Sequence, residues 1–122
     1  MALIPVMGIG KMTSVPVSEE SFTNTVIEYA QLQGWLVHHD RPAQSNKGWR
    51  TAIQGDAGFP DLVLLRGGLF IFAELKTGKG KVTAEQKRWL DAIRPLPGVL
   101  KFVWRPGDWD EIENWLKRRV EI

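Results

Sequence analysis

The sequence predicts a single α/β domain with the element order α-β-β-β-α-β-α, in which a mixed central sheet is flanked by helices. An apolar stripe at helical spacing indicates a first helix after Ser18. Two apolar runs separated by Gly67-Gly68 are typical of a β-hairpin. A second amphipathic run after Thr83 leads to the strand 99–104, and a helical crossover of this kind joins strands in parallel.

The first helix is expected to begin at Ser18, which is a good N-cap residue. At 100° per residue, Glu19 lies only about 20° from Val26, so it is the one acid of this helix placed to reach the core. A first-turn acid also suits stabilisation of the helix dipole, and that role stays open for Glu19. The inward stripe comprises Phe22, Val26, Ala30 and Gln33.

The run 35–39 is predicted to be a strand, and the segment 40–58 is predicted to be a long irregular loop. His38 and His39 are adjacent in the strand and face opposite sides, so at most one of them can reach a site. The loop is either disordered or a substrate-contacting segment. Its phosphate donors and stacking surface would be Arg41, Lys47, Trp49 and Arg50.

The hairpin brings two carboxyl groups together. If Arg66 pairs with Leu69, then Asp61 lies opposite Glu74, with Cβ atoms about 4.5–5.5 Å apart, and Lys76 shares their face. The alternative is an exposed cross-strand salt bridge. Both strands are apolar on both faces, however, as expected of strands that are covered twice, so the charges should be buried. Two buried carboxylates suggest a hard divalent cation between them.

Two further helices follow from capping patterns. Thr83 and Gln86 have the spacing of a capping box, and the helix should bury Trp89, Leu90 and Ile93. Gln86 is either the reciprocal cap partner of Thr83 or an active-site hydrogen-bond donor. The last helix is expected to open with Asp108 and Glu111. Its inward residues would be Ile112, Trp115 and Leu116.

Length and composition fit one domain. The chain has 122 residues, of which 43% are hydrophobic, and it has no cysteine. Disulfides, thiolate zinc sites and cysteine nucleophiles are therefore excluded, whereas a metal site with hard ligands remains. Residues 1–17 are expected to be an arm or an extra strand before a domain at 18–122. The N-terminal apolar run lacks a basic start and is too short for a membrane span, which favours an intracellular, soluble protein without a membrane partner.

The net charge of +2 is uninformative, but its distribution is not. Between Arg66 and Arg105 there are nine basic and three acidic residues, a local excess of 9 − 3 = +6. This excess predicts a surface for a nucleic-acid backbone, and the alternative is an ordinary solvated face. The basic residues are Arg66, Lys76, Lys79, Lys81, Lys87, Arg88, Arg94, Lys101 and Arg105.

Four ordered segments resemble a known family. Phe59-Pro60-Asp61 followed by Glu74-Leu75-Lys76 is similar to the motif of the PD-(D/E)xK nuclease superfamily. The resemblance narrows to the stand-alone VRR-NUC nucleases of phages and bacteria and covers about residues 18–119. Its four segments are Gly58–Val63, Ala73–Thr77, Gly80–Gln86 and Val103–Pro106.

The resemblance implies a restriction-endonuclease-like core and a DNA nuclease that depends on Mg²⁺ or Mn²⁺. Asp61, Glu74 and the backbone carbonyl of Leu75 would hold the metal, with Glu19 acting through water. Lys76 would orient or help deprotonate the attacking water, and Gln86 would donate a hydrogen bond in the site. Whether one metal or two bind stays open.

The preferred DNA structure stays open as well. A chain of this size would recognise a Holliday junction or branched DNA more easily as a homodimer with two-fold symmetry. Two other classes remain. One is a DNA-junction-binding module that does not cut, and the other is an interaction or structural domain whose charges only fix strand register.

Overall fold

The elements of the domain follow the predicted order. The computed structural model describes residues 3–8, 11–40, 43–45, 48–50 and 53–118. The core elements are α1 (Glu19–Leu32), β3 (Leu36–His39), β6 (Leu62–Arg66), β7 (Leu69–Leu75), α2 (Ala84–Ile93), β8 (Val99–Trp104) and α3 (Trp109–Leu116). The predicted α-β-β-β-α-β-α order is confirmed.

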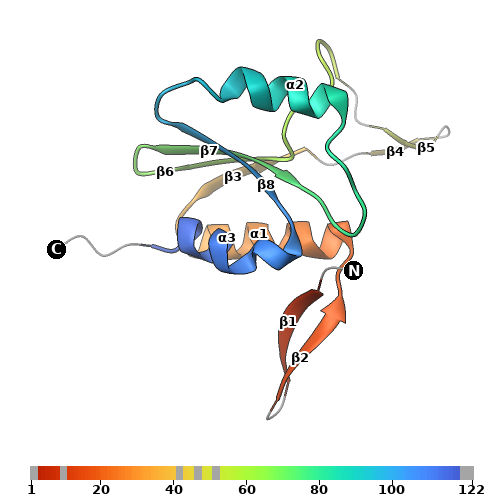
Figure 1. The fold of residues 1–122 in the computed structure, drawn as a ribbon, viewed down its shortest axis with the longest axis vertical. Helices are drawn as coiled ribbons and strands as arrows, with labels where there is room; N and C mark the ends of the chain where they lie inside the picture. Colours follow the sequence, from red (N-terminus) through yellow and green to blue (C-terminus); the bar gives the residue numbers. More distant parts are fainter. Residues whose placement is uncertain (1–2, 9–10, 41–42, 46–47, 51–52, 119–122) are drawn as a thin grey trace.

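The central sheet is mixed and has the strand order β3-β6-β7-β8. β3 and β7 both pair with β6 in antiparallel fashion, and β8 joins β7 in parallel after the α2 crossover, as the sequence predicts. In Figure 1, α2 covers one face of the sheet, and α1 and α3 lie together on the other face. The fold is therefore three-layered.

Two small hairpins lie outside this core. β1 (Leu3–Gly8) and β2 (Lys11–Pro16) form a hairpin in the segment before Ser18, which projects from the α1 and α3 side in Figure 1. β4 (Ala43–Ser45) and β5 (Gly48–Arg50) pair within the segment expected to be an irregular loop, so that expectation is wrong for these residues. Their three-residue runs are too short to show strand alternation. Arg41 and Lys47 lie outside the described residues, as do the side chains of Trp49 and Arg50.

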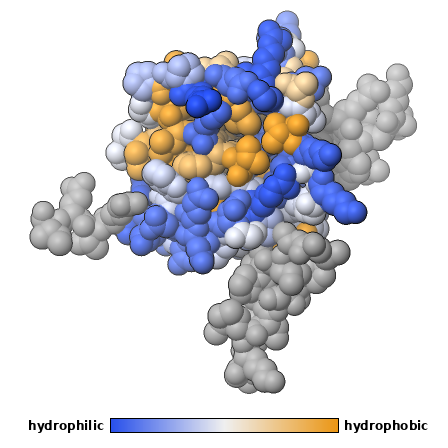
Figure 2. All heavy atoms as spheres, viewed as in Figure 1, coloured by the Kyte–Doolittle hydropathy of each residue, from blue (hydrophilic) through white to orange (hydrophobic). Residues whose placement is uncertain are grey.

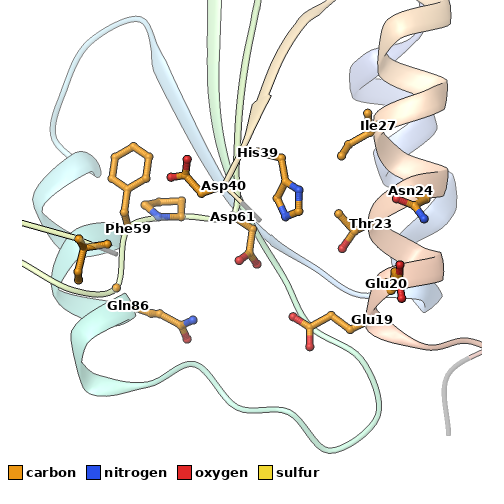
Figure 3. Close-up of a pocket in the computed structure, with 13 residues that line it drawn as sticks. Glu19, Glu20, Thr23, Asn24, Ile27, His39, Asp40, Phe59, Asp61 and Gln86 are labelled. Carbon is orange, nitrogen blue, oxygen red and sulfur yellow. The ribbon is translucent and has the colours of Figure 1, made fainter. Parts of the chain in front are cut away.

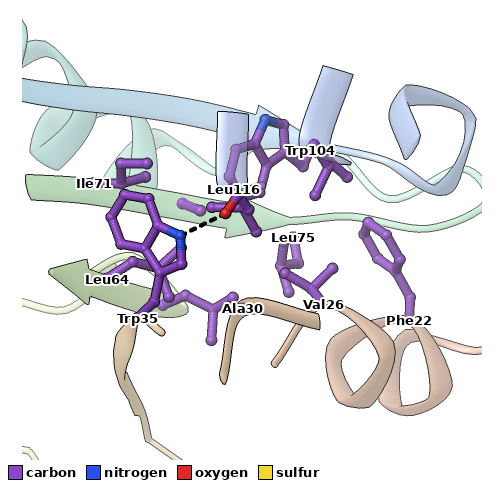
Figure 4. Packing of buried hydrophobic residues seen from close by; sticks show 12 residues of the cluster. Phe22, Val26, Ala30, Trp35, Leu64, Ile71, Leu75, Trp104 and Leu116 are labelled. Carbon is purple, nitrogen blue, oxygen red and sulfur yellow. Dashed lines mark hydrogen bonds between the residues drawn. The ribbon is translucent and has the colours of Figure 1, made fainter. Parts of the chain in front are cut away.

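The hydrophobic core lies between the sheet and the α1–α3 layer (Figure 4). Trp35 ties the layers together, because its indole Nε1–H donates a 2.9 Å hydrogen bond to the backbone oxygen of Leu116. The predicted stripe of α1 is confirmed for Phe22, Val26 and Ala30, which are fully buried, whereas Gln33 is half-buried and is the C-cap of the helix. The rest of this cluster is Leu62, Leu64, Ile71, Ala73, Leu75, Trp104, Ile112 and Leu116.

The opposite face of the sheet is only partly covered, contrary to the expectation of strands covered twice. Val63, Phe70 and Phe72 are half-buried, and Leu65 is 42% exposed. A ten-residue helix is about 15 Å long and about 10–12 Å across, which is less than the face of a four-stranded sheet whose strand β7, with seven residues, is alone about 23 Å long. Figure 2 shows apolar residues at the level of the sheet, between hydrophilic residues above and below.

Two of the predicted core tryptophans are less buried than expected. Trp89 of α2 and Trp115 of α3 are only half-buried, although Leu90, Ile93, Ile112 and Leu116 of the same helices are buried. α3 begins directly after Asp108, as predicted, but Asp108 does not cap the helix with its side chain. The Asp108 carboxylate accepts the backbone N–H of Arg105 at 2.9 Å and makes no cap hydrogen bond to α3. A short 3₁₀ turn, η1 (Pro106–Asp108), precedes the helix, and the Asp108 side chain bonds to the residue that begins this turn.

Arg66 lies at the far end of the sheet from the predicted carboxylates. Its guanidinium stacks 4.5 Å from the ring of Trp35. It donates hydrogen bonds to the backbone oxygens of Gln33 at 2.7 Å and Leu116 at 2.9 Å. Cations are favourable at helix C-termini, so Arg66 joins the ends of α1 and α3. Its inclusion in a nucleic-acid surface was therefore wrong. None of the described helices is long and apolar enough to cross a membrane.

Candidate active site

The β6–β7 turn sets the position of the two carboxyl groups. Gly67 and Gly68 have φ angles of 53° and 82°, which the primed hairpin turn requires. Arg66 pairs with Leu69 as predicted, and the last ladder pair is Leu62 with Ala73. The next position in this register matches Asp61 with Glu74, so both acids lie at the same end of the sheet.

Asp61 is held just before β6 by a backbone group. Its Oδ2 accepts the N–H of Leu75 at 2.8 Å, which joins the start of one strand to the end of the next. The Leu75 side chain is fully buried in the core. The backbone of residues 74–76 is therefore fixed beside the Asp61 carboxylate. The backbone N–H of Lys76 is also fixed, because it donates a hydrogen bond to the backbone oxygen of Trp104 at 3.0 Å.

Glu74 is the buried acid of the site, with an exposed fraction of 1%. Its Oε1 accepts a hydrogen bond from the Gln86 amide at 2.8 Å and lies 3.7 Å from Lys76 Nζ. Its Oε2 is buried and has no hydrogen-bond partner among the described residues. An unsatisfied buried carboxylate oxygen is costly unless another group compensates it.

Burial, more than any neighbour, raises the pKa of Glu74 to about 8. Asp61 acts in the same direction, both through its negative charge and because its carboxylate can accept a hydrogen bond only from the protonated form of Glu74; the charge of Glu19 adds a smaller effect, whereas Lys76 lowers the pKa. The site therefore has more negative charge than Lys76 alone can compensate. A strongly perturbed carboxyl group with identified partners is a feature of functional sites.

Gln86 forms the capping box with Thr83 and also contacts the buried acid Glu74, so the two contacts expected from the sequence do not exclude each other. Its side-chain Oε1 accepts the backbone N–H of Thr83 at 2.9 Å, and the backbone N–H of Gln86 donates to the Thr83 hydroxyl at 3.1 Å, which completes the capping box. Its Nε2 simultaneously donates to Glu74. The first turn of α2 is thus attached to the buried acid.

The loop before Asp61 is fixed against α2 by close packing. Gly58 has a φ of +95°, and a Cβ atom there would lie 2.5 Å from the backbone carbon of Glu85. The Trp89 Nε1–H donates to the Ala57 backbone oxygen at 3.0 Å, and the Phe59 ring packs edge-to-face on Trp89 at 5.1 Å. These contacts explain why glycine and an aromatic residue precede Pro60-Asp61.

Asp61 opens into a cavity of about 810 Å³ between α1 and α2, whereas the buried Glu74 lies behind its contact Gln86 and does not itself line the cavity (Figure 3). Glu19 is exposed at the start of α1, where Ser18 forms the predicted N-cap, and it lines the cavity with Asp61 and Gln86. Glu20 is exposed and lines it as well, and because Glu19 is itself exposed, the expectation that it reaches the core was wrong. A helical wheel gives only the angle of each side chain around the helix axis, whereas this cavity lies at the end of the helix, where neighbouring residues of the first turn can both reach it.

His39 and Asp40 are among the cavity-lining residues that were not identified as site residues from the sequence. His39 lines the cavity, whereas His38 points elsewhere and pairs with Asp40 at 2.8 Å on the exposed side. The alternation rule was therefore right that only one histidine reaches the cavity. Asp40 lines it too, because His39 pairs with Leu62 and the next position lies opposite Asp61. That register was the missing signal.

The expected ligand set for a metal has only two directly binding carboxylates, Asp61 and Glu74. Within the described ranges, no three His, Cys, Asp or Glu side chains are grouped closely enough to enclose a metal ion by themselves. That result leaves the two-carboxylate set a prediction.

Comparison with known proteins supports the fold. No family model matches the sequence, and no curated protein does. Among solved structures, one described as a VRR_NUC domain protein superimposes with a TM-score of 0.56, over 86% of this chain and 95% of that chain. The fold is that of a VRR_NUC domain. At 17% identity, this similarity concerns the architecture and not the chemistry.

The four segments of the sequence resemblance come together in this fold. Three of them, which carry Asp61, Glu74 with Lys76, and Gln86, meet at one end of the sheet. The fourth supplies Arg105, whose guanidinium donates to the backbone oxygen of Gly80 at 2.7 Å.

Positive charge lies on the connection from β7 to α2 of this VRR_NUC fold. Lys79 and Lys81 are exposed there, close in sequence to Lys76, and Arg105 fixes the backbone between them at Gly80. Lys87 pairs with Asp91 at 2.9 Å on the exposed face of α2. The excess of positive charge near the site is therefore concentrated in the segment 76–81.

Proposed function

We propose that this chain is a metal-dependent nuclease that hydrolyses phosphodiester bonds of DNA. The observation that carries the proposal is the buried Glu74 carboxyl group, which lies 3.7 Å from Lys76 and has one oxygen without a hydrogen-bond partner among the described residues. A structural salt bridge would satisfy that oxygen, whereas a site that binds a cation would leave it free.

The donor set fits a hard divalent cation, Mg²⁺ or Mn²⁺. Asp61, Glu74 and the backbone carbonyl of Leu75 would hold it, with Glu19 contributing through water. All of these donors are oxygens, the ligand type that both ions prefer. When bound, such an ion activates water and polarises a phosphoryl oxygen.

The protein's own groups prepare the reaction. Gln86 and the Leu75 N–H fix the two carboxylates by hydrogen bonds of 2.8 Å each. Lys76 is 13% exposed, so its ammonium group meets little competing solvent. It would orient or help deprotonate the attacking water and offset the charge that develops on the phosphate. Its proximity to Glu74 also favours the ionised carboxylate.

DNA is the proposed partner because exposed lysines adjoin the acids. Lys79 and Lys81 offer phosphate contacts on the segment that follows β7. Branched DNA or a four-way junction is the proposed substrate structure, with a homodimer as the form that would match its symmetry.

The primary test is cleavage of a labelled panel comprising a four-way junction, a flap, a duplex and single-stranded DNA. Each substrate is incubated with Mg²⁺, Mn²⁺ or EDTA, using wild type and Asp61→Asn. The nuclease proposal expects metal-dependent cutting that Asp61→Asn abolishes. Metal-independent DNA binding without cutting would instead support a junction-binding module. Gel filtration with light scattering tests the homodimer.

Lys76→Ala separates catalysis from metal binding. We expect cleavage to fall by at least about 10²-fold, the usual cost of removing one electrostatic stabiliser of the transition state. Calorimetric Mn²⁺ binding should persist, because the oxygen donors remain. Lys117→Ala is the matched control, since Lys117 is exposed at the other end of the sheet. Loss of Mn²⁺ binding in Lys76→Ala would contradict the assigned role.

A further inference from the structure

The cavity continues beyond the acids into a part that the proposed hydrolysis does not use. Its far wall is formed by Thr23, Asn24 and Ile27 of α1, together with His39 of β3. Figure 3 shows Glu19 and Gln86 at one end of the cavity and Ile27 and His39 toward the other, with Asp61 between them. We call the part lined by Thr23, Asn24, Ile27 and His39 the α1 pocket.

Charge is distributed unequally around the cavity. The described residues that line it include no lysine or arginine, and its acids are Glu19, Glu20, Asp40 and Asp61. Lys79 and Lys81 instead lie on the connection from β7 to α2, which passes the Glu19–Gln86 end in Figure 3. A DNA phosphate is favoured near the lysines and near a cation held at Asp61, and it is repelled by Glu20 and Asp40, which belong to no proposed metal site. The α1 pocket therefore suits an uncharged part of the substrate.

The chemistry of the α1 pocket matches a nucleobase. Ile27 is half-buried against the core and offers an apolar surface. Asn24 is exposed on the same helix and carries both a donor and an acceptor, as does the Thr23 hydroxyl. A base needs contacts of these two kinds, one for its flat face and one for its polar edge. Carboxylates near the pocket would accept hydrogen bonds from exocyclic amino groups.

The same charges indicate whether the nucleobase in the α1 pocket is paired with a complementary strand. A paired base would bring the complementary strand, with its own phosphates, toward Glu20 and Asp40. An unpaired base enters without that strand. We propose that the α1 pocket receives one unpaired nucleobase next to the cleaved phosphate, so that branched DNA with unpaired nucleotides is preferred to a fully paired four-way junction. This inference rests on the proposed nuclease function.

Three duplexes test the preference directly. One carries a single unpaired nucleotide, one is fully paired, and one has an abasic residue in place of the unpaired nucleotide. We expect kcat/KM to be at least about tenfold higher for the unpaired nucleotide than for either of the others, since contacts to one base change binding by roughly that factor or more. Equal cutting of all three overturns this inference alone. No cutting of these duplexes or of the four-substrate panel overturns the nuclease proposal and this inference with it.

Variants of α1 locate the base. Ile27→Trp should fill the α1 pocket and remove the preference, whereas Leu32→Trp, at a position 78% exposed on the same helix, should keep it. Asn24→Ala should reduce the preference without altering the core, with Gln31→Ala as its exposed control. A 2-aminopurine base at the unpaired position, bound to Asp61→Asn, reports occupancy by fluorescence. A signal unchanged between Asp61→Asn alone and Asp61→Asn with Ile27→Trp would contradict the assignment.

Discussion

Replacing Glu74 with glutamine should stabilise the metal-free protein at pH 8 and above. The folded-state pKa of Glu74 is about 8, against 4.5 for an unperturbed glutamate. Between these values the folded protein holds a proton that the unfolded chain has released. The stability associated with the protonated carboxyl is therefore complete below pH 4.5 and is lost as pH rises toward 8. Glutamine mimics the protonated form at every pH and should keep that stability.

The size of the effect follows from the same interval. At about 1.4 kcal/mol per pH unit, the span from pH 4.5 to about 8 sets an upper limit of about 5 kcal/mol on the loss of unfolding free energy that the ionisation of Glu74 causes. The neighbouring Asp61 causes part of this shift, which reduces the part due to the burial of Glu74 alone. We expect a difference of about 2–5 kcal/mol between the variant and wild type at pH 9. That is a large part of the stability of a small domain.

The assay is urea unfolding in EDTA at five pH values from 5 to 9, for wild type, Glu74→Gln and the control Glu28→Gln. Glu28 is exposed on α1, so its variant should follow wild type. Glu74→Gln should instead have a flatter pH profile, with its largest gain at high pH. Mg²⁺ should restore wild-type stability at pH 9 and leave Glu74→Gln unchanged. Parallel profiles for Glu74→Gln and wild type would refute the reasoning, because Glu74 would then ionise as easily in the folded protein as in the unfolded chain.

Two other substitutions test how the site is supported. Gly58→Ala should lower the free energy of unfolding by more than about 2 kcal/mol, since its Cβ would meet the Glu85 backbone at 2.5 Å; Gly55→Ala has a similar φ of +99° with nothing within 4 Å and should lose only the strain energy. Equal losses in denaturant unfolding would mean that the close approach is unimportant. Thr83→Ala should cost about 1 kcal/mol through the lost N-cap and should also weaken Mn²⁺ binding measured by calorimetry, because Gln86 loses a fixing contact. Unchanged Mn²⁺ affinity would show that the Thr83 cap does not support the metal-binding residues.

The β6–β7 register was predictable because a short glycine turn leaves one pairing for Arg66 and Leu69. The inward stripe of α1 and the capping box at Thr83 were predictable for a similar reason, since each depends on residues within a few positions of one another. The features that were missed depend on distant partners. His39 and Asp40 reach the cavity through the pairing of β3 with β6, and no short turn joins those strands.

The partly covered sheet face was missed for a different reason. Apolar residues on both sides of a strand indicate that both sides can be buried, but they do not give the size of the element that covers each side. Leu65 remains 42% exposed because α2 is short and lies over only part of the sheet. The assignment of Arg66 failed in a related way. Its charge was read as a surface property, whereas the folded chain uses it to bind the backbone at the ends of two helices.

The Gln86 side chain makes local unwinding of α2 and disruption of the site a single event. Fraying of the first helical turn releases the Thr83 contacts and withdraws the amide from Glu74 at the same time. Amide hydrogen exchange at the start of α2 would thus report on the integrity of the buried acid. For the same reason, evolution cannot adjust the stability of this helix end through Gln86 without also changing the carboxyl group that it contacts.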